Sequence, residues 1–443
     1  MSGHRCRDGD PYTPGAGDER YEVAHYELRL RYRVSTNRLD GRAVLDVRVL
    51  QETGSLRLDM AGLRVVSVSV DGRAPAAVRH RERLLQLRLR RRAAPGERLR
   101  VEVDYRGRPA PRRTPWGEIG WEELADGALV SGQPIGASTW FPCNDRPGYK
   151  AAFSVSIAVE RGYTAVCNGV RTGRRQSSGG QIWSYEQREP TAVYLATVQI
   201  GRYAAERLDE GRGGVPVRLV APPRLQRAAR REFAVLPAAI ARFGELFGPY
   251  PFPEYTVVVT ADDLEIPLES QGLATFGANH VRPTTAEPRL VVHELAHMWF
   301  GNSVGLRHWR DIWLNEGFAC YAEWLWSEHL GGESAERLAR RHHARLAAMG
   351  QELLLADPGA RLMFDDRVYK RGALCLHALR LRLGEARFFA LLRAWTDRYR
   401  HGLVESADFE RLAAEHAGEP LDELFGPWLR ERRLPPFPLG PRA

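Results

Sequence analysis

Apolar and polar side chains alternate strictly through much of the first two hundred residues. Between Tyr26 and Val34 every second residue is apolar, and the residues between them are charged. A period of two places the apolar side chains on one face of a β-strand and the charged ones on the other. The same pattern predicts strands at 56–60, 66–70, 85–89, 99–105, 153–159, 181–185 and 191–200, with a hairpin turn at Asp71-Gly72.

The second half of the chain has mainly helical spacing. A helix is expected at 224–247, followed by a buried strand at 255–260 and a strand at 272–276 at the edge of a small sheet. Further helices are expected at 289–300, from 316 to about 330, at 386–399 and at 406–416. The sequence therefore predicts an α+β protein with an N-terminal antiparallel β domain at 1–221 and a mainly α domain at 222–443.

Composition argues against a membrane protein and against a secreted one. No segment approaches the roughly 18 uninterrupted apolar residues of a membrane span, and the first eight residues lack the apolar core of a secretory signal. The cysteines are odd in number and lack C-x-x-C spacing, which favours reduced thiols in a cytoplasmic protein. They are Cys6, Cys143, Cys167, Cys320 and Cys375.

The net charge of +9 comes almost entirely from arginine, because lysine occurs only at Lys150 and Lys370. The arginines are spread along predicted strands and helices instead of forming one stripe, so we interpret them as a general replacement of lysine. We expect no nucleic-acid partner and no membrane partner. The sequence carries no signal for an oligomeric state.

Residues 293–297, with the sequence H-E-L-A-H, predict a metal site. On a helix His293 and His297 lie one turn apart on the same face, so both imidazoles can reach one ion. A catalytic zinc takes three protein ligands and keeps one position open. Glu316, nineteen positions after His297, is the expected third ligand, and Glu294 is the expected general base. The alternative is a buried helix with two hydrogen-bonded histidines, which is costly without a metal.

Four motifs in order resemble those of the gluzincin aminopeptidases, the zinc peptidase family that includes membrane alanyl aminopeptidase and leukotriene hydrolase. They are W-F-P-C-N-D-R-P at 140–147, L-E-S-Q-G-L-A-T at 268–275, the pentad with N-E-G-F-A at 315–319, and Y-K-R-G-A at 369–373. The resemblance extends from about residue 12 to 435. It implies a saddle-like β domain, a thermolysin-like catalytic domain, and an aminopeptidase that acts on peptides with a free N-terminus.

The resemblance also implies roles for single residues. Glu269 would bind the ammonium group of the substrate, and Gln133 would belong to a substrate-binding segment. Tyr369 would donate a hydrogen bond to the oxyanion of the tetrahedral intermediate. The substrate backbone would pair with the strand that contains Gly272, Leu273 and Ala274.

One further carboxylate has two readings. Glu323, on the same predicted helix as Glu316, either orients a zinc-bound imidazole or is a surface carboxylate.

The chain also departs from the family pattern. Ile266 and Ser270 replace the usual glycine and asparagine of the exopeptidase motif, and Ile135 stands where a second acidic residue is common. We expect the family's large C-terminal helical domain to be absent after residue 435, and the cleft to be either more open or covered by an oligomer partner. Two alternatives to an aminopeptidase remain: an endopeptidase or epoxide hydrolase on the same zinc, and a non-catalytic zinc-stabilised binding protein.

Overall fold

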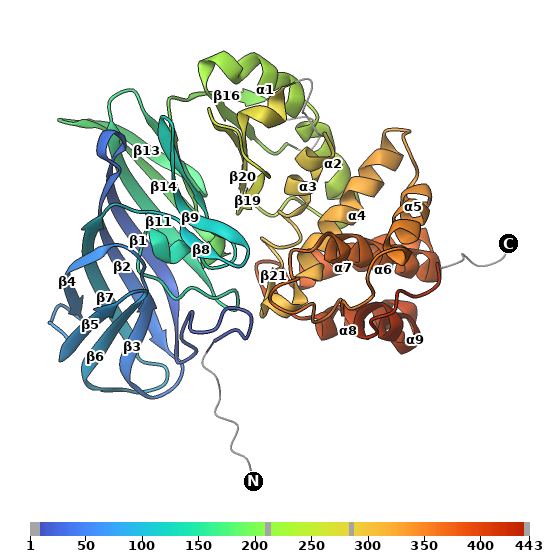
Figure 1. Ribbon diagram of the computed structural model, residues 1–443, viewed down its shortest axis with the longest axis horizontal. Coiled ribbons are helices and arrows are strands. Elements are labelled where there is room, and N and C mark those ends of the chain that lie inside the picture. Colours follow the sequence, from blue (N-terminus) through green and yellow to red (C-terminus); the bar gives the residue numbers. More distant parts are fainter. Residues whose placement is uncertain (1–8, 209–213, 283–287, 438–443) are drawn as a thin grey trace, which may run out of the picture. The chain divides into compact units, whose positions relative to one another are not determined.

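The computed structural model describes residues 9–208, 214–282 and 288–437 (Figure 1). The chain forms two compact units, one made of 1–206, 220–226 and 257–278, the other of 207–219, 227–256 and 279–443. We call them the N-terminal unit and the C-terminal unit. Cys6 and the first eight residues, for which we predict no secretory signal, lie outside the described residues. The other four cysteines are buried free thiols. The domain boundary at 221 stays a prediction.

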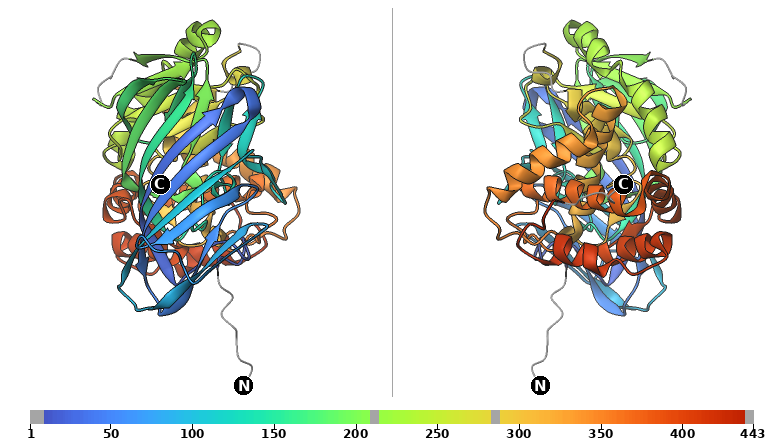
Figure 2. Two further views of the ribbon diagram at one scale, coloured as in Figure 1. Left: turned by 90° about the vertical axis from the view of Figure 1, so that its left-hand side faces the viewer. Right: turned by 90° about the vertical axis from the view of Figure 1, so that its right-hand side faces the viewer.

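A seven-stranded sheet with the order β13-β14-β11-β1-β2-β7-β4 dominates the N-terminal unit. Figure 2 shows its long strands β1 and β2 side by side in blue. The alternation predicts these strands well, because Tyr26, Leu28 and Leu30 are all buried. One pair is not antiparallel as expected: β1 runs parallel to β11. The bounds are β1 Tyr21–Arg33, β2 Arg38–Val49, β4 Arg64–Val70, β7 Arg98–Gly107, β11 Lys150–Glu160, β13 Val170–Ser177 and β14 Gly180–Ala192.

Two smaller sheets also lie in this unit. Their orders are β12-β15-β10-β9-β8 and β3-β6-β5. The prediction of one continuous strand at 191–200 is wrong, because a 3-10 turn at Val193–Leu195 separates the end of β14 from β15. The turn at Asp71-Gly72 is present, with positive φ at both residues. The bounds are β3 Thr53–Asp59, β5 Ala77–Arg81, β6 Leu84–Ala93, β8 Arg112–Thr114, β9 Gly117–Leu124, β10 Gly127–Ser131, β12 Thr164–Cys167 and β15 Val198–Gly201.

Five further strands follow β15 before the last two short ones. They are β16 Ala204–Leu208, β17 Val217–Ala221, β18 Tyr255–Val259, β19 Leu268–Ser270 and β20 Leu273–Phe276. The strand predicted at 272–276 exists as β20, but it is not an edge strand. It lies between β18 and β19, and β19 forms the edge.

Helices make up most of the C-terminal unit. The single helix expected at 224–247 is two helices, because Pro237 lacks the N–H group that a continuous helix requires. The helix expected at 289–300 ends at Ala296. The bounds are α1 Gln226–Phe233, α2 Leu236–Phe247, α3 Pro288–Ala296, α4 Trp313–His329, α5 Ala335–Ala347, α6 Asp366–Leu383, α7 Glu385–Arg398, α8 Ser406–Ala417 and α9 Asp422–Phe425, with strands β21 Gly305–Leu306 and β22 Leu403–Val404. Within the described residues, no helix is long and apolar enough to cross a membrane.

Candidate metal centre

Helix α3 presents both histidines of the pentad to one point. His297 follows the last residue of α3, but its backbone N–H still donates to the carbonyl of His293 at 3.3 Å. The two imidazoles therefore stay on one face, with ring centroids 4.9 Å apart. Both are buried, at 8% and 2% exposure. Gly301, with φ of 120°, then turns the chain away from α3.

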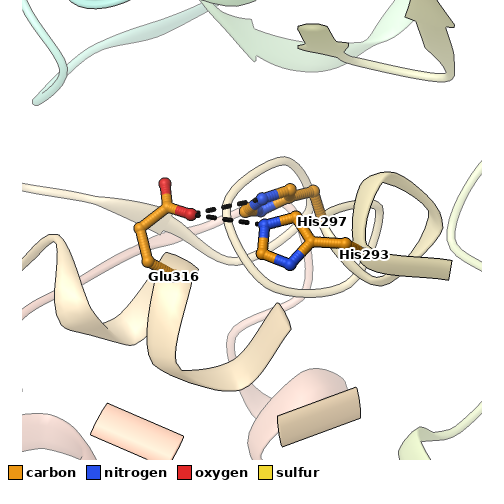
Figure 3. A group of neighbouring side chains, drawn as sticks. All are labelled: His293, His297 and Glu316. Atoms are coloured by element: carbon orange, nitrogen blue, oxygen red, sulfur yellow. Dashed lines mark ion pairs between the residues drawn. The ribbon is translucent and has the colours of Figure 1, made fainter. Parts of the chain in front are cut away.

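Glu316 reaches the same point from the first turn of α4. Its Oε2 lies 3.7 Å from Nε2 of His293 and 3.5 Å from Nε2 of His297. Figure 3 shows the carboxylate facing both rings. Two ligand atoms bound to one zinc at tetrahedral angles are about 3.4 Å apart. The three donor atoms therefore have the spacing and the chemistry of a His-His-Glu zinc site.

Hydrogen bonds fix which nitrogen of each ring faces the centre. Nδ1 of His293 donates to Oε1 of Glu323 at 2.7 Å, and Nδ1 of His297 donates to the carbonyl of Phe300 at 3.1 Å. Each Nε2 then faces Glu316, and in the neutral ring this nitrogen carries the lone pair that binds a metal. Glu323 is buried, so it is not a surface carboxylate.

The electrostatics of the cluster call for a positive charge at its centre. Burial opposes a charge on His293, but hydrogen bonds to Glu316 and Glu323 outweigh burial and raise the pKa of His293 to about 10. Burial likewise opposes a charge on Glu316, and the two histidines overcome it and lower the pKa of that carboxyl. A buried carboxylate flanked by two imidazoles is stabilised either by a proton or by a bound cation.

A close helix crossing carries Tyr369 to this cluster. Helices α4 and α6 touch at Gly317 and Gly372, where a Cβ added to Gly317 would lie only 2.8 Å from Cα of Gly372. Any larger side chain would hold the two helices apart. The ring of Tyr369, on α6, stacks on the ring of His293 with centroids 6.1 Å apart and planes inclined by 18°.

Glu294 is buried beside the ligands in the C-terminal unit. Only 4% of it is exposed. One of its carboxylate oxygens lies within 4.8 Å of a ring nitrogen of His297. Burial raises the pKa of Tyr255, and the negative charge of Glu294 raises it further.

The remaining predicted residues form a group within the N-terminal unit. Nε2 of Gln133 donates to Oε1 of Glu269 at 2.8 Å, and Glu269 lies opposite Ala274 in the β19–β20 hairpin. Gly272 forms the turn of this hairpin with φ of 71°, and Leu273 and Ala274 are buried in β20. Because β20 is internal, a peptide that pairs with this end of the sheet would pair with the edge strand β19.

Lys370 and Cys320 have no role predicted from the sequence, although they contact each other in the C-terminal unit. Nζ of Lys370 donates to Sγ of Cys320 at 3.2 Å, and both side chains are buried. The sequence does contain a feature that could have pointed to Lys370, because lysine is rare in this arginine-rich chain.

Residues 22–195 match the Peptidase M1 N-terminal domain, and residues 235–428 match the Peptidase family M1 domain. A solved two-domain M1 zinc metallopeptidase with L-tryptophan bound is 30% identical to this chain. The match covers 97% of this chain and 99% of that one, with a TM-score of 0.86. This chain belongs to peptidase family M1. Its predicted fold class, a β-rich domain followed by a helical catalytic domain, is confirmed.

Other M1 proteins are similar over most of this chain. The M1 zinc metallopeptidase of Deinococcus radiodurans is 29% identical, covers 98% of this chain and 99% of that one, and has a TM-score of 0.86. A mutant of the Deinococcus protein has been solved with a Tyr-Ser-Ala substrate. Aminopeptidase M1-D of Oryza sativa subsp. japonica is 25% identical over 93% of this chain, and leucyl aminopeptidase of Saccharolobus solfataricus is 24% identical over 94%. The chain spans about half the length of these two relatives, 50% and 54%.

Proposed function

We propose that this M1 family member is a zinc aminopeptidase that removes the N-terminal residue from peptides. The observation that carries the proposal is the convergence of Nε2 of His293, Nε2 of His297 and Oε2 of Glu316, which lie within 4.8 Å of one another in a buried site. The names of the similar proteins support the same function. The proposal includes the thermolysin-like character of the catalytic domain and a cytoplasmic location.

One zinc ion would be held by His293, His297 and Glu316. When bound, zinc supplies a Lewis acid that polarises a carbonyl and makes water acidic enough to ionise near neutral pH. Glu323 and the carbonyl of Phe300 hold the two imidazoles in the orientation that this binding needs.

Glu294 acts as the general base. Its carboxylate takes a proton from the attacking water and delivers it to the leaving amine. Tyr369 donates its phenolic proton as a hydrogen bond to the oxyanion that develops on the substrate carbonyl. The stacking of its ring on His293 holds it in place before the substrate arrives.

Glu269 and Gln133 read the substrate's free amine. The carboxylate of Glu269 pairs with the substrate's ammonium group, and the amide of Gln133 holds that carboxylate in position. An N-acetylated peptide has no such charge, and it leaves the half-buried carboxylate of Glu269 without its partner.

A direct test combines metal analysis with a panel of aminoacyl-arylamides, N-acetylated peptides and an epoxide substrate. We expect one zinc per chain. We expect hydrolysis only of substrates that have a free N-terminal amine. Glu294→Gln should keep the zinc and lose hydrolysis, whereas Glu269→Ala should chiefly raise KM. Equal cleavage of blocked and free peptides would instead identify an endopeptidase, and zinc without any hydrolysis would identify a binding protein.

A further inference from the structure

Lys370 carries a buried positive charge next to the metal centre. Only 8% of the residue is exposed. Its Nζ donates to Sγ of Cys320 at 3.2 Å and lies 3.9 Å from Oδ1 of Asp366. A thiol is a weak acceptor and Asp366 is largely exposed, so neither contact alone compensates for the loss of water around the ammonium group.

Glu323 lies near Cys320, the hydrogen-bond partner of Lys370, on α4. Cys320 and Glu323 lie three positions apart on this helix and therefore share one of its faces. Glu323 is also buried, and Oε2 accepts a hydrogen bond from Nη1 of Arg289 at 3.2 Å while Oε1 accepts one from His293. Burial favours the neutral form of Glu323. The hydrogen bond from His293 and the charges of His293, Lys370 and Arg289 outweigh burial and lower its pKa to about 2.

The two cations beside Glu323 differ in their surroundings. The side chain of Arg289 is 54% exposed, whereas that of Lys370 is 10% exposed. Solvent and salt screen the exposed charge strongly and the buried charge weakly. The charge of Lys370 is therefore screened less than that of Arg289, although only Arg289 donates a hydrogen bond to Glu323.

We propose that Lys370 is a positioning residue of the metal centre: its buried ammonium group keeps Glu323 in place as the carboxylate that aims Nε2 of His293 at the metal. The inference rests on the proposed zinc site and extends it to a residue outside the three proposed ligands. Lys370 acts through Glu323, and Glu323 acts through His293.

Lys370 has two opposing effects on zinc affinity. The sign of the measured change in affinity on Lys370→Met shows which effect is larger. A positive charge near a cation site weakens binding of the cation by repulsion. Support of Glu323 strengthens binding, because loss of the group that orients a ligand histidine typically costs about 10-fold to 100-fold in affinity. Under the proposal Lys370→Met therefore weakens zinc binding, whereas repulsion alone predicts tighter binding.

The experiment measures the zinc dissociation constant by competition with a chromophoric chelator. The proteins are the wild type, Lys370→Met, Glu323→Gln and the double variant. We expect Lys370→Met to raise the dissociation constant about 10-fold and to add nothing in the Glu323→Gln background. Lys370→Arg should restore most of the affinity. The matched control Arg289→Met should have a smaller effect that fades at high salt.

Unchanged or tighter zinc binding by Lys370→Met would overturn the proposal, and so would an equal loss in the Glu323→Gln background. The unfolding temperature of the zinc-free proteins is measured in parallel. Failure of Lys370→Met and Lys370→Gln to fold would also overturn the proposal, because a purely structural role would then explain the lysine. Absence of zinc binding by the wild type would refute the proposed function itself.

Discussion

Gly317→Ala tests whether the contact between α4 and α6 assembles the metal centre. The new Cβ would lie 2.8 Å from Cα and 2.9 Å from the carbonyl carbon of Gly372. Carbon atoms pack comfortably at about 3.5–4.0 Å, so the helices have to separate by about 1 Å. Glu316 precedes Gly317 in α4, and its Oε2 is 3.5 Å from the nearer imidazole nitrogen. A shift of this size is large compared with the tolerance of a zinc site.

The expected effect on stability is smaller than the effect on catalysis. Overpacking costs about 1–3 kcal/mol, and the better helix propensity of alanine returns up to about 1 kcal/mol. We therefore expect a loss of about 1–2 kcal/mol in the free energy of unfolding. A misplacement of about 1 Å costs about 100-fold in rate. The assays are kcat/KM on an aminoacyl-arylamide, zinc content, and urea denaturation.

Gly244→Ala is the matched control. Gly244 is also a glycine inside a helix of the C-terminal unit, α2, but a Cβ there has no neighbour within 4 Å. This variant should gain about 0.5–1 kcal/mol and keep full activity. If Gly317→Ala behaves like Gly244→Ala, the close crossing does not position Glu316 and the reasoning is refuted.

Three further predictions concern the hydroxyl of Tyr369, a buried aspartate and the metal. Tyr369→Phe should lower kcat about 100-fold, equivalent to about 3 kcal/mol, with little change in KM; a full-rate variant would remove the hydroxyl from the mechanism. Burial and the charge of Asp59 raise the pKa of Asp145 to about 8, so the folded protein holds this proton more tightly than the unfolded chain does. The resulting stability is complete below about pH 4, the pKa of unfolded aspartate, and is lost as pH rises through about 8. The free energy of unfolding should therefore decrease more between pH 5 and pH 9 in the wild type than in Asp145→Asn. Asp104→Asn changes an aspartate on the solvent-exposed face of β7 and should show the same decrease with pH as the wild type. Removal of zinc by a chelator should abolish hydrolysis, and zinc at 100 times its dissociation constant should restore activity and about 2.7 kcal/mol of stability; activity that survives complete removal of the metal would contradict the zinc mechanism.

Local patterns in the sequence determined the elements and the donor set. The alternation around Tyr26 predicts β1, because a period of two is a property of the strand alone. The spacing of His293 and His297 places both rings on one face, because that spacing is close to one helical turn. The chemistry of zinc requires a third protein ligand at a catalytic site, and Glu316, nineteen positions after His297, is the expected one.

Contacts between distant segments were decided only in the tertiary structure. Three such contacts join residues far apart in sequence: the parallel pairing of β1 with β11, the hydrogen bond between Glu323 and His293, and the contact between Gly317 and Gly372. The bond between Lys370 and Cys320 spans 50 positions. No periodicity records such contacts, because they depend on how the helices and strands pack against each other. The sequence therefore names the three candidate ligands, and the packing of α3, α4 and α6 decides which other side chains hold them in place.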